Sequence, residues 1–142
     1  MVDLIKLINN TFWLKDKHKV LVTLNMDPGY SVYGEKIFKY NNKEYREWNP
    51  FRSKLAAAFN KGLNKIDINA GSSILYLGAS TGTTVSHLSD IVGIEGSIYA
   101  VEIAKEVGIR LILLAERRSN IFPIIYDASK LIDKKDNIEK VD

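Results

Sequence analysis

The sequence predicts an α/β protein that combines a small antiparallel β domain with half of a doubly wound, Rossmann-like parallel sheet. Two observations support this prediction. Short β-rich runs separated by turn signals fill residues 1–49, a pattern typical of antiparallel hairpins. Apolar runs then alternate with helical patterns through residues 50–142, the order expected for βαβ units. We therefore place a domain boundary after Asn49.

The N-terminal β domain is predicted from runs that favour strands and are separated by polar turns such as "DPGYS". Residues 4–8 suit either a further strand or a short helix. Asn41 and Asn42 join two of the runs, and asparagine tolerates the positive φ of a two-residue hairpin turn. The four clearest runs are Thr11–Lys15, Val20–Leu24, Lys36–Tyr40 and Lys43–Glu47.

The second part of the chain begins with Asn49 and Pro50, a capping residue followed by proline at a first helical position. We therefore expect "FRSKLAAAFNKGL" to be helical. The runs "SSILYLG", "GSIYAVE" and "IFPIIYD" are typical of buried strands, and "TTVSHLSDIVG" and "EVGIRLILLAERRSN" between them are typical of helices. Short connections of this kind predict a right-handed parallel βαβαβ unit.

The composition limits the possible functions. The 142 residues are 46% hydrophobic and 26% charged, and a net charge of +3 permits a polyanionic partner without requiring one. Cysteine is absent, and His18 and His87 are far apart in the sequence, so we expect no metal site. We also expect a cytoplasmic protein without membrane contact, because no signal peptide or membrane-length apolar run is present.

The stretch "GASTG" lies where the first parallel strand gives way to a helix, which is where ligands bind in sheets of this type. Gly78 and Gly82 allow the backbone to approach a ligand closely, and Thr83 and Thr84 place amide and hydroxyl groups at the helix start. The stretch lacks both the G-x-G-x-x-G spacing and a P-loop lysine. An oxidoreductase domain that binds a dinucleotide through its pyrophosphate is therefore a disfavoured interpretation of this turn.

Acidic residues close the next two strands. Glu102 follows Gly82 by about 20 residues, where a carboxylate binds ribose hydroxyls in dinucleotide folds. Asp127 ends the third strand and can accept from an adenine amine, while Ala128 leaves room for the ring. Either carboxylate alone is more often a solvated or helix-capping group. Together with the glycine-rich turn, they suggest a nucleoside-containing cofactor without phosphates, namely S-adenosylmethionine.

Three stretches closely resemble fibrillarin, in particular the short archaeal form. They are "SVYGEKIFKYNNKEYREWNPFRSKLAAA", "ILYLGASTGTTVSHLSDIVGIEGSIYAVE" and "NIFPIIYDAS", and the resemblance covers residues 30–130 nearly without gaps. It implies a Rossmann-like, S-adenosylmethionine-dependent methyltransferase fold. The implied activity is 2′-O-methylation of ribose in rRNA and tRNA.

The resemblance also implies partners and site residues. The family works in box C/D ribonucleoproteins with a guide RNA, a Nop-domain scaffold protein and an L7Ae-type kink-turn protein. Lys54 matches the first lysine of the family's catalytic lysine, aspartate, lysine and histidine set. The residues expected to bind the cofactor are Gly78, Ala79, Thr83, Thr84, Glu102, Ile103, Asp127 and Ala128.

The family continues beyond this chain, and the other three catalytic residues lie in that continuation. The final "KVD" resembles the start of a fourth strand. We therefore expect a shortened form, or one half of a split protein, in which the first parallel strand has an unpaired edge. A catalytically incomplete fragment that binds cofactor, RNA or the scaffold without turnover is the second functional hypothesis.

Three residues near the predicted boundary are candidates for RNA contact. Arg46, Trp48 and Arg52 can bind RNA backbone and stack with bases, although an aromatic residue here is equally expected to pack between sheet and helix. Without the family resemblance, Lys54 is interpreted as an ordinary exposed lysine. His87 is expected to be structural rather than catalytic.

Overall fold

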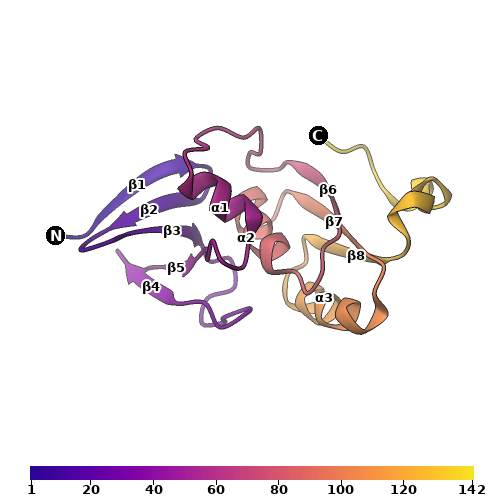
Figure 1. Ribbon diagram of the computed structural model, residues 1–142, viewed down its shortest axis with the longest axis horizontal. Coiled ribbons are helices and arrows are strands. Elements are labelled where there is room, and N and C mark those ends of the chain that lie inside the picture. The colour runs from indigo at the N-terminus through magenta and orange to yellow at the C-terminus, as the bar shows by residue number, and fades with distance from the viewer.

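The computed structural model describes residues 1–142 as two sheets joined through helices (Figure 1). The first sheet is antiparallel and five-stranded, in the order β1-β2-β3-β5-β4. The 4–8 run is part of a strand. Asn41 and Asn42 both have positive φ, as the predicted hairpin turn requires. The strands are β1 (Asp3–Ile8), β2 (Thr11–Lys15), β3 (Lys19–Leu24), β4 (Ile37–Tyr40) and β5 (Lys43–Glu47).

The first helix, α1 (Lys54–Asn60), begins four residues later than the sequence predicts. The side chain of Asn49 accepts a hydrogen bond from the Phe51 amide, which makes a local turn instead of a helix cap. Ser53 is the actual cap, and its side chain accepts from the Ala56 amide. The predicted helix start at Asn49 and Pro50 is therefore wrong.

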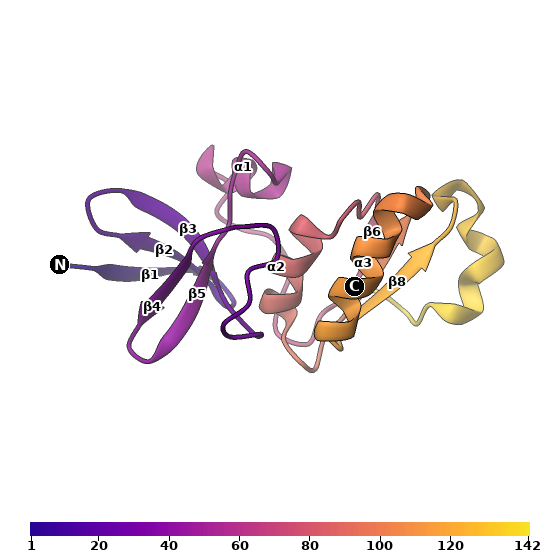
Figure 2. The ribbon, with the colours of Figure 1, turned by 90° about the horizontal axis from the view of Figure 1, so that it is seen from below.

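The second sheet is parallel and contains β6 (Ser73–Leu77), β7 (Ser97–Glu102) and β8 (Ile121–Ile125), in that order. The crossover helices are α2 (Thr83–Val92) and α3 (Lys105–Arg117). Figure 2 shows both helices on the side of the parallel sheet that faces the antiparallel one, with α2 between the two sheets. This confirms the predicted α/β class and the βαβαβ unit.

Helix α2 is buried from Val85 to Val92 without interruption. Its apolar side chains join one core cluster that also contains Trp13, Leu21 and Trp48 of the first sheet region and Ile98 of β7. A surface helix buries one stripe only, whereas α2 is covered from both sides. The core therefore runs through α2 from one sheet to the other.

The polar side of α2 is held by buried ion pairs. The two carboxylate oxygens of Asp90 accept from Arg46 at 2.9 Å and from Arg118 at 2.6 Å, and Arg46 also donates to Glu35 at 2.8 Å. The charged groups of all four side chains are shielded from solvent. Thr23 adds a hydrogen bond to Asp90 at 2.7 Å. We call the four charged residues the Asp90 network.

His87, one turn before Asp90, is fully buried. Its Nδ1 lies 2.8 Å from the Thr23 hydroxyl and its Nε2 lies 2.8 Å from the Tyr33 hydroxyl. The ring also stacks on Trp48, with 5.0 Å between the ring centroids. Burial, together with the positive charges of Arg46 and Arg118, holds the pKa of His87 well below its ordinary value.

Strand β6 pairs only with β7, so it is an edge strand. After β8, the 3-10 segment η1 (Ala128–Asn137) contains no buried residue. The chain then returns to β6, where the Asp142 amide donates to the Ser73 carbonyl and the Ser73 amide donates to the Asp142 side chain, both at 2.8 Å. None of the helices is long and apolar enough to cross a membrane.

The Asp90 network generates a stability prediction. Asp90→Asn leaves Arg46 and Arg118 buried without full charge compensation, which costs about 3–5 kcal/mol of unfolding free energy. Urea denaturation measures this loss. Asp27→Asn is the matched control, because its partner Arg117 is 45% exposed and its midpoint should change little. Equal shifts for the two variants would contradict a special role for the network.

His87 generates a pH prediction. The unfolded chain protonates His87 as the pH falls through about 6.5, whereas the folded chain resists protonation because its pKa is lowered. Below pH 6.5 the unfolded state therefore binds more protons than the folded state. The contribution of neutral His87 to the unfolding free energy is complete above about pH 6.5 and is lost as the pH falls below it, by up to about 1.4 kcal/mol per pH unit.

The measurement is the unfolding free energy of wild type and His87→Gln at several pH values between neutrality and mild acid. The difference between the two should change with pH. The exposed His18 provides the control substitution, His18→Gln. Parallel curves for wild type and His87→Gln would show that His87 does not remain neutral in the fold.

Candidate functional site

A small hollow lies at the carboxyl ends of the three parallel strands, where ligands bind in open α/β sheets. Its volume is about 150 Å³, below the roughly 300–1,000 Å³ of common ligand pockets, so it can enclose only part of a cofactor. We call it the strand-end hollow. Its lining residues are Gly78, Val101, Glu102, Ile103, Tyr126, Asp127 and Ala128.

The turn at residues 78–82 forms one wall of this hollow. Gly78 and Gly82 have φ values of +77° and +92°, a conformation that side chains rarely adopt. The amides of Gly78 and Ala79 both donate to the Val101 carbonyl of β7. A Cβ atom on Gly78 would meet no atom within 4 Å, so this backbone is open to a ligand.

Glu102 is fixed by two backbone amides. Its Oε1 accepts from Ser80 at 2.8 Å and its Oε2 accepts from Ala104 at 2.9 Å. Each carboxylate oxygen has two lone-pair sites, so each can accept one further hydrogen bond. The side chain is thus oriented in advance for a ligand that donates two hydroxyl groups.

Asp127 is oriented by Ser129. Its Oδ1 accepts from the Ser129 amide at 2.9 Å and from the Ser129 hydroxyl at 2.7 Å, while Oδ2 has no partner within the chain. Hydrogen bonds from the Ser129 side chain and amide lower the pKa of Asp127, so it is ionised at neutral pH. Its free oxygen can accept from an amine.

The structure brings five of the eight expected cofactor residues together and places the other three elsewhere. Gly78, Glu102, Ile103, Asp127 and Ala128 line the strand-end hollow. Ala79 is buried in the core cluster beside it.

The remaining two residues, Thr83 and Thr84, begin α2 on the other side of the turn. Thr83 lines a separate cavity. The Thr84 hydroxyl lies 2.9 Å from that of Ser53, so the cap of α1 contacts the start of α2. Lys54, the expected catalytic residue, follows Ser53 at the exposed start of α1 and forms no ion pair.

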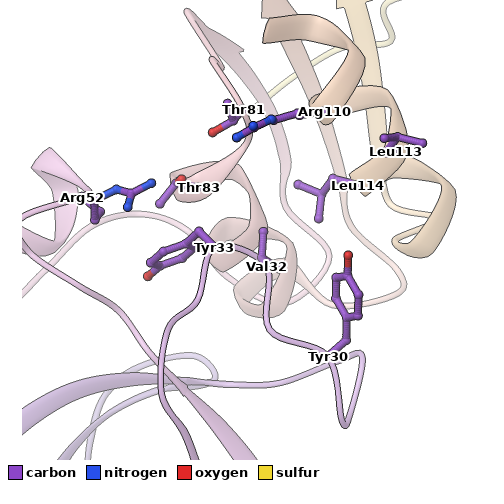
Figure 3. Close-up of a pocket in the computed structure, with 9 residues that line it drawn as sticks. All are labelled: Tyr30, Val32, Tyr33, Arg52, Thr81, Thr83, Arg110, Leu113 and Leu114. Carbon is purple, nitrogen blue, oxygen red and sulfur yellow. The ribbon is translucent and has the colours of Figure 1, made fainter.

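The separate cavity has a volume of about 400 Å³ and is shown in Figure 3. We call it the arginine cleft, because Arg52 and Arg110 both line it. Arg46 and Trp48 are fully buried, so of the three candidates for RNA contact only Arg52 reaches a surface. The cleft residues are Tyr30, Val32, Tyr33, Arg52, Thr81, Thr83, Arg110, Leu113 and Leu114.

Sequence reasoning missed three residues at these sites. Ser80 has a φ of 53° and orients Glu102, Tyr126 lines the hollow, and Arg110 lines the cleft. Tyr126 precedes Asp127 at the end of a strand, so its position in the sequence could have predicted that it lines the hollow. The positions of Ser80 and Arg110 depend on contacts between distant elements, which no local pattern records.

Comparisons with known proteins agree with this architecture. A protein of Sulfolobus acidocaldarius named fibrillarin-like rRNA/tRNA 2′-O-methyltransferase is 52% identical over 122 residues, which are 86% of this chain and 53% of the relative. The crystal structure of Aeropyrum pernix fibrillarin with natively bound S-adenosyl-L-methionine matches with a TM-score of 0.90 and 43% identity, covering 100% of this chain and 65% of that one.

A fibrillarin/Nop5p complex contains a chain that matches with a TM-score of 0.82 and 46% identity, covering 96% of this chain and 60% of that one. This chain spans about half the length of the curated relatives it matches. The family model described as Fibrillarin matches residues 3–142. The chain therefore belongs to the fibrillarin family.

Proposed function

We propose that this chain supplies the cofactor-binding part of an S-adenosylmethionine-dependent RNA 2′-O-methyltransferase. The observation that supports this most strongly is the strand-end hollow. Two carboxylates, each oriented by backbone amides or a neighbouring serine, lie at the ends of adjacent parallel strands. The similar fibrillarin of Aeropyrum pernix holds S-adenosyl-L-methionine.

Each residue of the hollow has a proposed role. Glu102 accepts the ribose hydroxyls of the cofactor, and Asp127 accepts from the adenine amine with its free oxygen. Ile103 and Ala128 contact the nucleoside. Gly78 allows the backbone to pass close to it, and Ala79 contributes its backbone next to Gly78. Thr83 and Thr84 are proposed to contact the remainder of the cofactor from the start of α2.

The cofactor supplies a sulfonium-bound methyl group for transfer to a ribose 2′-hydroxyl oxygen. That hydroxyl is a poor nucleophile at neutral pH, so it must be positioned in line with the methyl group and must lose its proton. We propose that Lys54 orients the hydroxyl. The contact between Ser53 and Thr84 fixes the start of α1 beside the start of α2, which limits where Lys54 can reach.

The proposed partners are a box C/D guide RNA, its rRNA or tRNA target, a Nop-domain scaffold protein and an L7Ae-type kink-turn protein. A Nop-domain partner is supported by the fibrillarin/Nop5p complex. RNA substrates are supported by the names of the archaeal relatives. A cytoplasmic location is part of the same proposal, since these relatives are named for rRNA and tRNA.

A second candidate function is binding of cofactor, RNA or scaffold without turnover. It is favoured by the composition of the strand-end hollow, whose lining groups are suited to binding a ligand. A methyl-transfer assay with a box C/D guide and target RNA distinguishes the two candidates, since binding alone leaves the target ribose unmodified.

The cofactor assignment is tested by isothermal titration of S-adenosylmethionine into the 142-residue chain. Glu102→Ala and Asp127→Ala should each weaken binding about ten- to a hundredfold, because each removes a hydrogen bond to a charged group worth about 1.5–3 kcal/mol. Glu106→Ala, an exposed position in the first turn of α3, is the charge-matched control. Unchanged binding in both site variants would refute the assignment.

The two turn glycines should respond differently to alanine. Gly78→Ala adds a methyl group that meets no protein atom, so it should cost only the strain of positive φ, about 1–2 kcal/mol, while it obstructs the cofactor. Gly82→Ala places its Cβ 2.6 Å from Leu114 Cδ2, so it should lower stability further and affect the cofactor less. Urea denaturation and cofactor titration measure the two effects. Normal cofactor binding by Gly78→Ala would show that the cofactor does not cover this backbone.

A further inference from the structure

The arginine cleft is a second, chemically distinct site on the other side of the glycine turn. It lies between α3, the loop that contains Tyr30 and Tyr33, and the segment before α1 (Figure 3). It shares no lining residue with the strand-end hollow, and its lining contains no acidic residue. At about 400 Å³, the cleft is large enough for a ligand group of small-molecule size.

The two arginines of the cleft are available for a ligand. Arg52 and Arg110 are exposed, and neither guanidinium takes part in an ion pair. The chain's other three arginines, Arg46, Arg117 and Arg118, each form an ion pair with a carboxylate. Figure 3 shows Arg110 extending from α3 toward Thr81, and Arg52 extending toward Thr83.

The remaining polar groups of the cleft favour an anion. Thr81 and Thr83 contribute hydroxyl groups, which can donate to an acceptor. Burial raises the pKa of Tyr33 to about 12, so this side chain stays neutral. Asp27, near Tyr30, is held by Arg117 at 2.7 Å. A phosphate in the cleft therefore meets hydrogen-bond donors. The nearby carboxylate of Asp27 is already paired with Arg117.

The aromatic rings of the cleft are already in contact with cations. Arg117 lies 3.8 Å from the centre of the Tyr30 ring, and Arg52 lies 5.6 Å from that of Tyr33. Stacking of bases needs open aromatic faces, so the cleft suits the sugar-phosphate backbone better than the bases. Guanidinium groups bind phosphate through paired hydrogen bonds.

We propose that the arginine cleft binds the phosphodiester backbone of RNA, with Arg52 and Arg110 as the phosphate contacts. The choice of RNA as the polyanion rests on the proposed function. The cleft adds a place where the RNA substrate of that function is held. Contacts to the sugar-phosphate backbone hold RNA without reading its sequence. RNA in the cleft lies against Thr81. Thr83 marks the boundary between this RNA and the part of the cofactor that is proposed to reach the start of α2.

The test is the binding of a labelled single-stranded RNA oligonucleotide to the full 142-residue chain, followed by fluorescence anisotropy from about 50 to about 200 mM salt. In the double variant Arg52→Gln/Arg110→Gln, affinity at low salt should fall roughly ten- to a hundredfold. The slope of log affinity against log salt should decrease by about 1.4, because two phosphate contacts are lost.

The matched control removes the same charge elsewhere. Lys6→Gln/Lys15→Gln changes two exposed lysines on β1 and β2, far from α3 in Figure 1, and should leave the slope nearly unchanged. Equal losses in the two double variants would overturn the proposal, because net charge alone would then explain binding. Binding of inorganic phosphate without binding of RNA would assign the cleft to a free anion and also overturn it.

Titration of S-adenosylmethionine into the arginine double variant separates this proposal from the proposed function. Cofactor affinity should stay within a few fold of the wild-type value, because neither arginine lines the hollow that holds the nucleoside, and this also shows that the variant is folded. A wild-type chain that binds cofactor but no RNA would overturn the cleft proposal alone. A chain that binds RNA through the cleft but no cofactor would overturn the cofactor assignment and leave the cleft standing.

Discussion

The carboxylate of Asp90 fixes how the two sheets lie relative to each other. It accepts from Arg46 of the antiparallel sheet and from Arg118 at the end of α3, while Asp90 itself belongs to α2. Burying such a group is unfavourable unless its partners are correctly placed, so alternative arrangements of the sheets leave charges unpaired in the core. Apolar packing around α2 is non-directional and does not by itself select one orientation of the sheets. The ion pairs of Asp90 select it, because they form only when Arg46 and Arg118 are correctly placed.

The same packing extends to the candidate site. His87 lies one turn from Asp90 and stacks on Trp48, and the Trp48 indole donates to the Ser53 hydroxyl at 3.0 Å. Ser53 in turn contacts Thr84 and caps α1. A continuous set of contacts therefore runs from the buried charges to the residue before Lys54. Because each member is buried or partly buried, the start of α1 is held by the core rather than by solvent-exposed contacts.

The sequence predicts the fold well where local chemistry decides the structure. Strand positions, the Asn41–Asn42 turn and the carboxylates at strand ends follow from periodicity and turn preferences, and the structure places Glu102 and Asp127 in one hollow. The start of α1 was misplaced because Asn49 can cap a helix or form a turn, and tertiary contacts of Ser53 decide between them. Arg46 is a candidate for RNA contact in the sequence, but it is fully buried in the structure. Its burial depends on Asp90, 44 residues away in sequence.

The glycine turn separates two environments of opposite charge. The strand-end hollow presents Glu102 and Asp127, which suit the hydroxyl and amine donors of a nucleoside and repel phosphate. The arginine cleft presents two guanidinium groups and no carboxylate, which suits a polyanion. Like charges repel and opposite charges attract at short range, so each site disfavours the other's proposed ligand. This arrangement would keep the phosphates of a bound polyanion out of the strand-end hollow, although only the turn at residues 78–82 lies between the two sites.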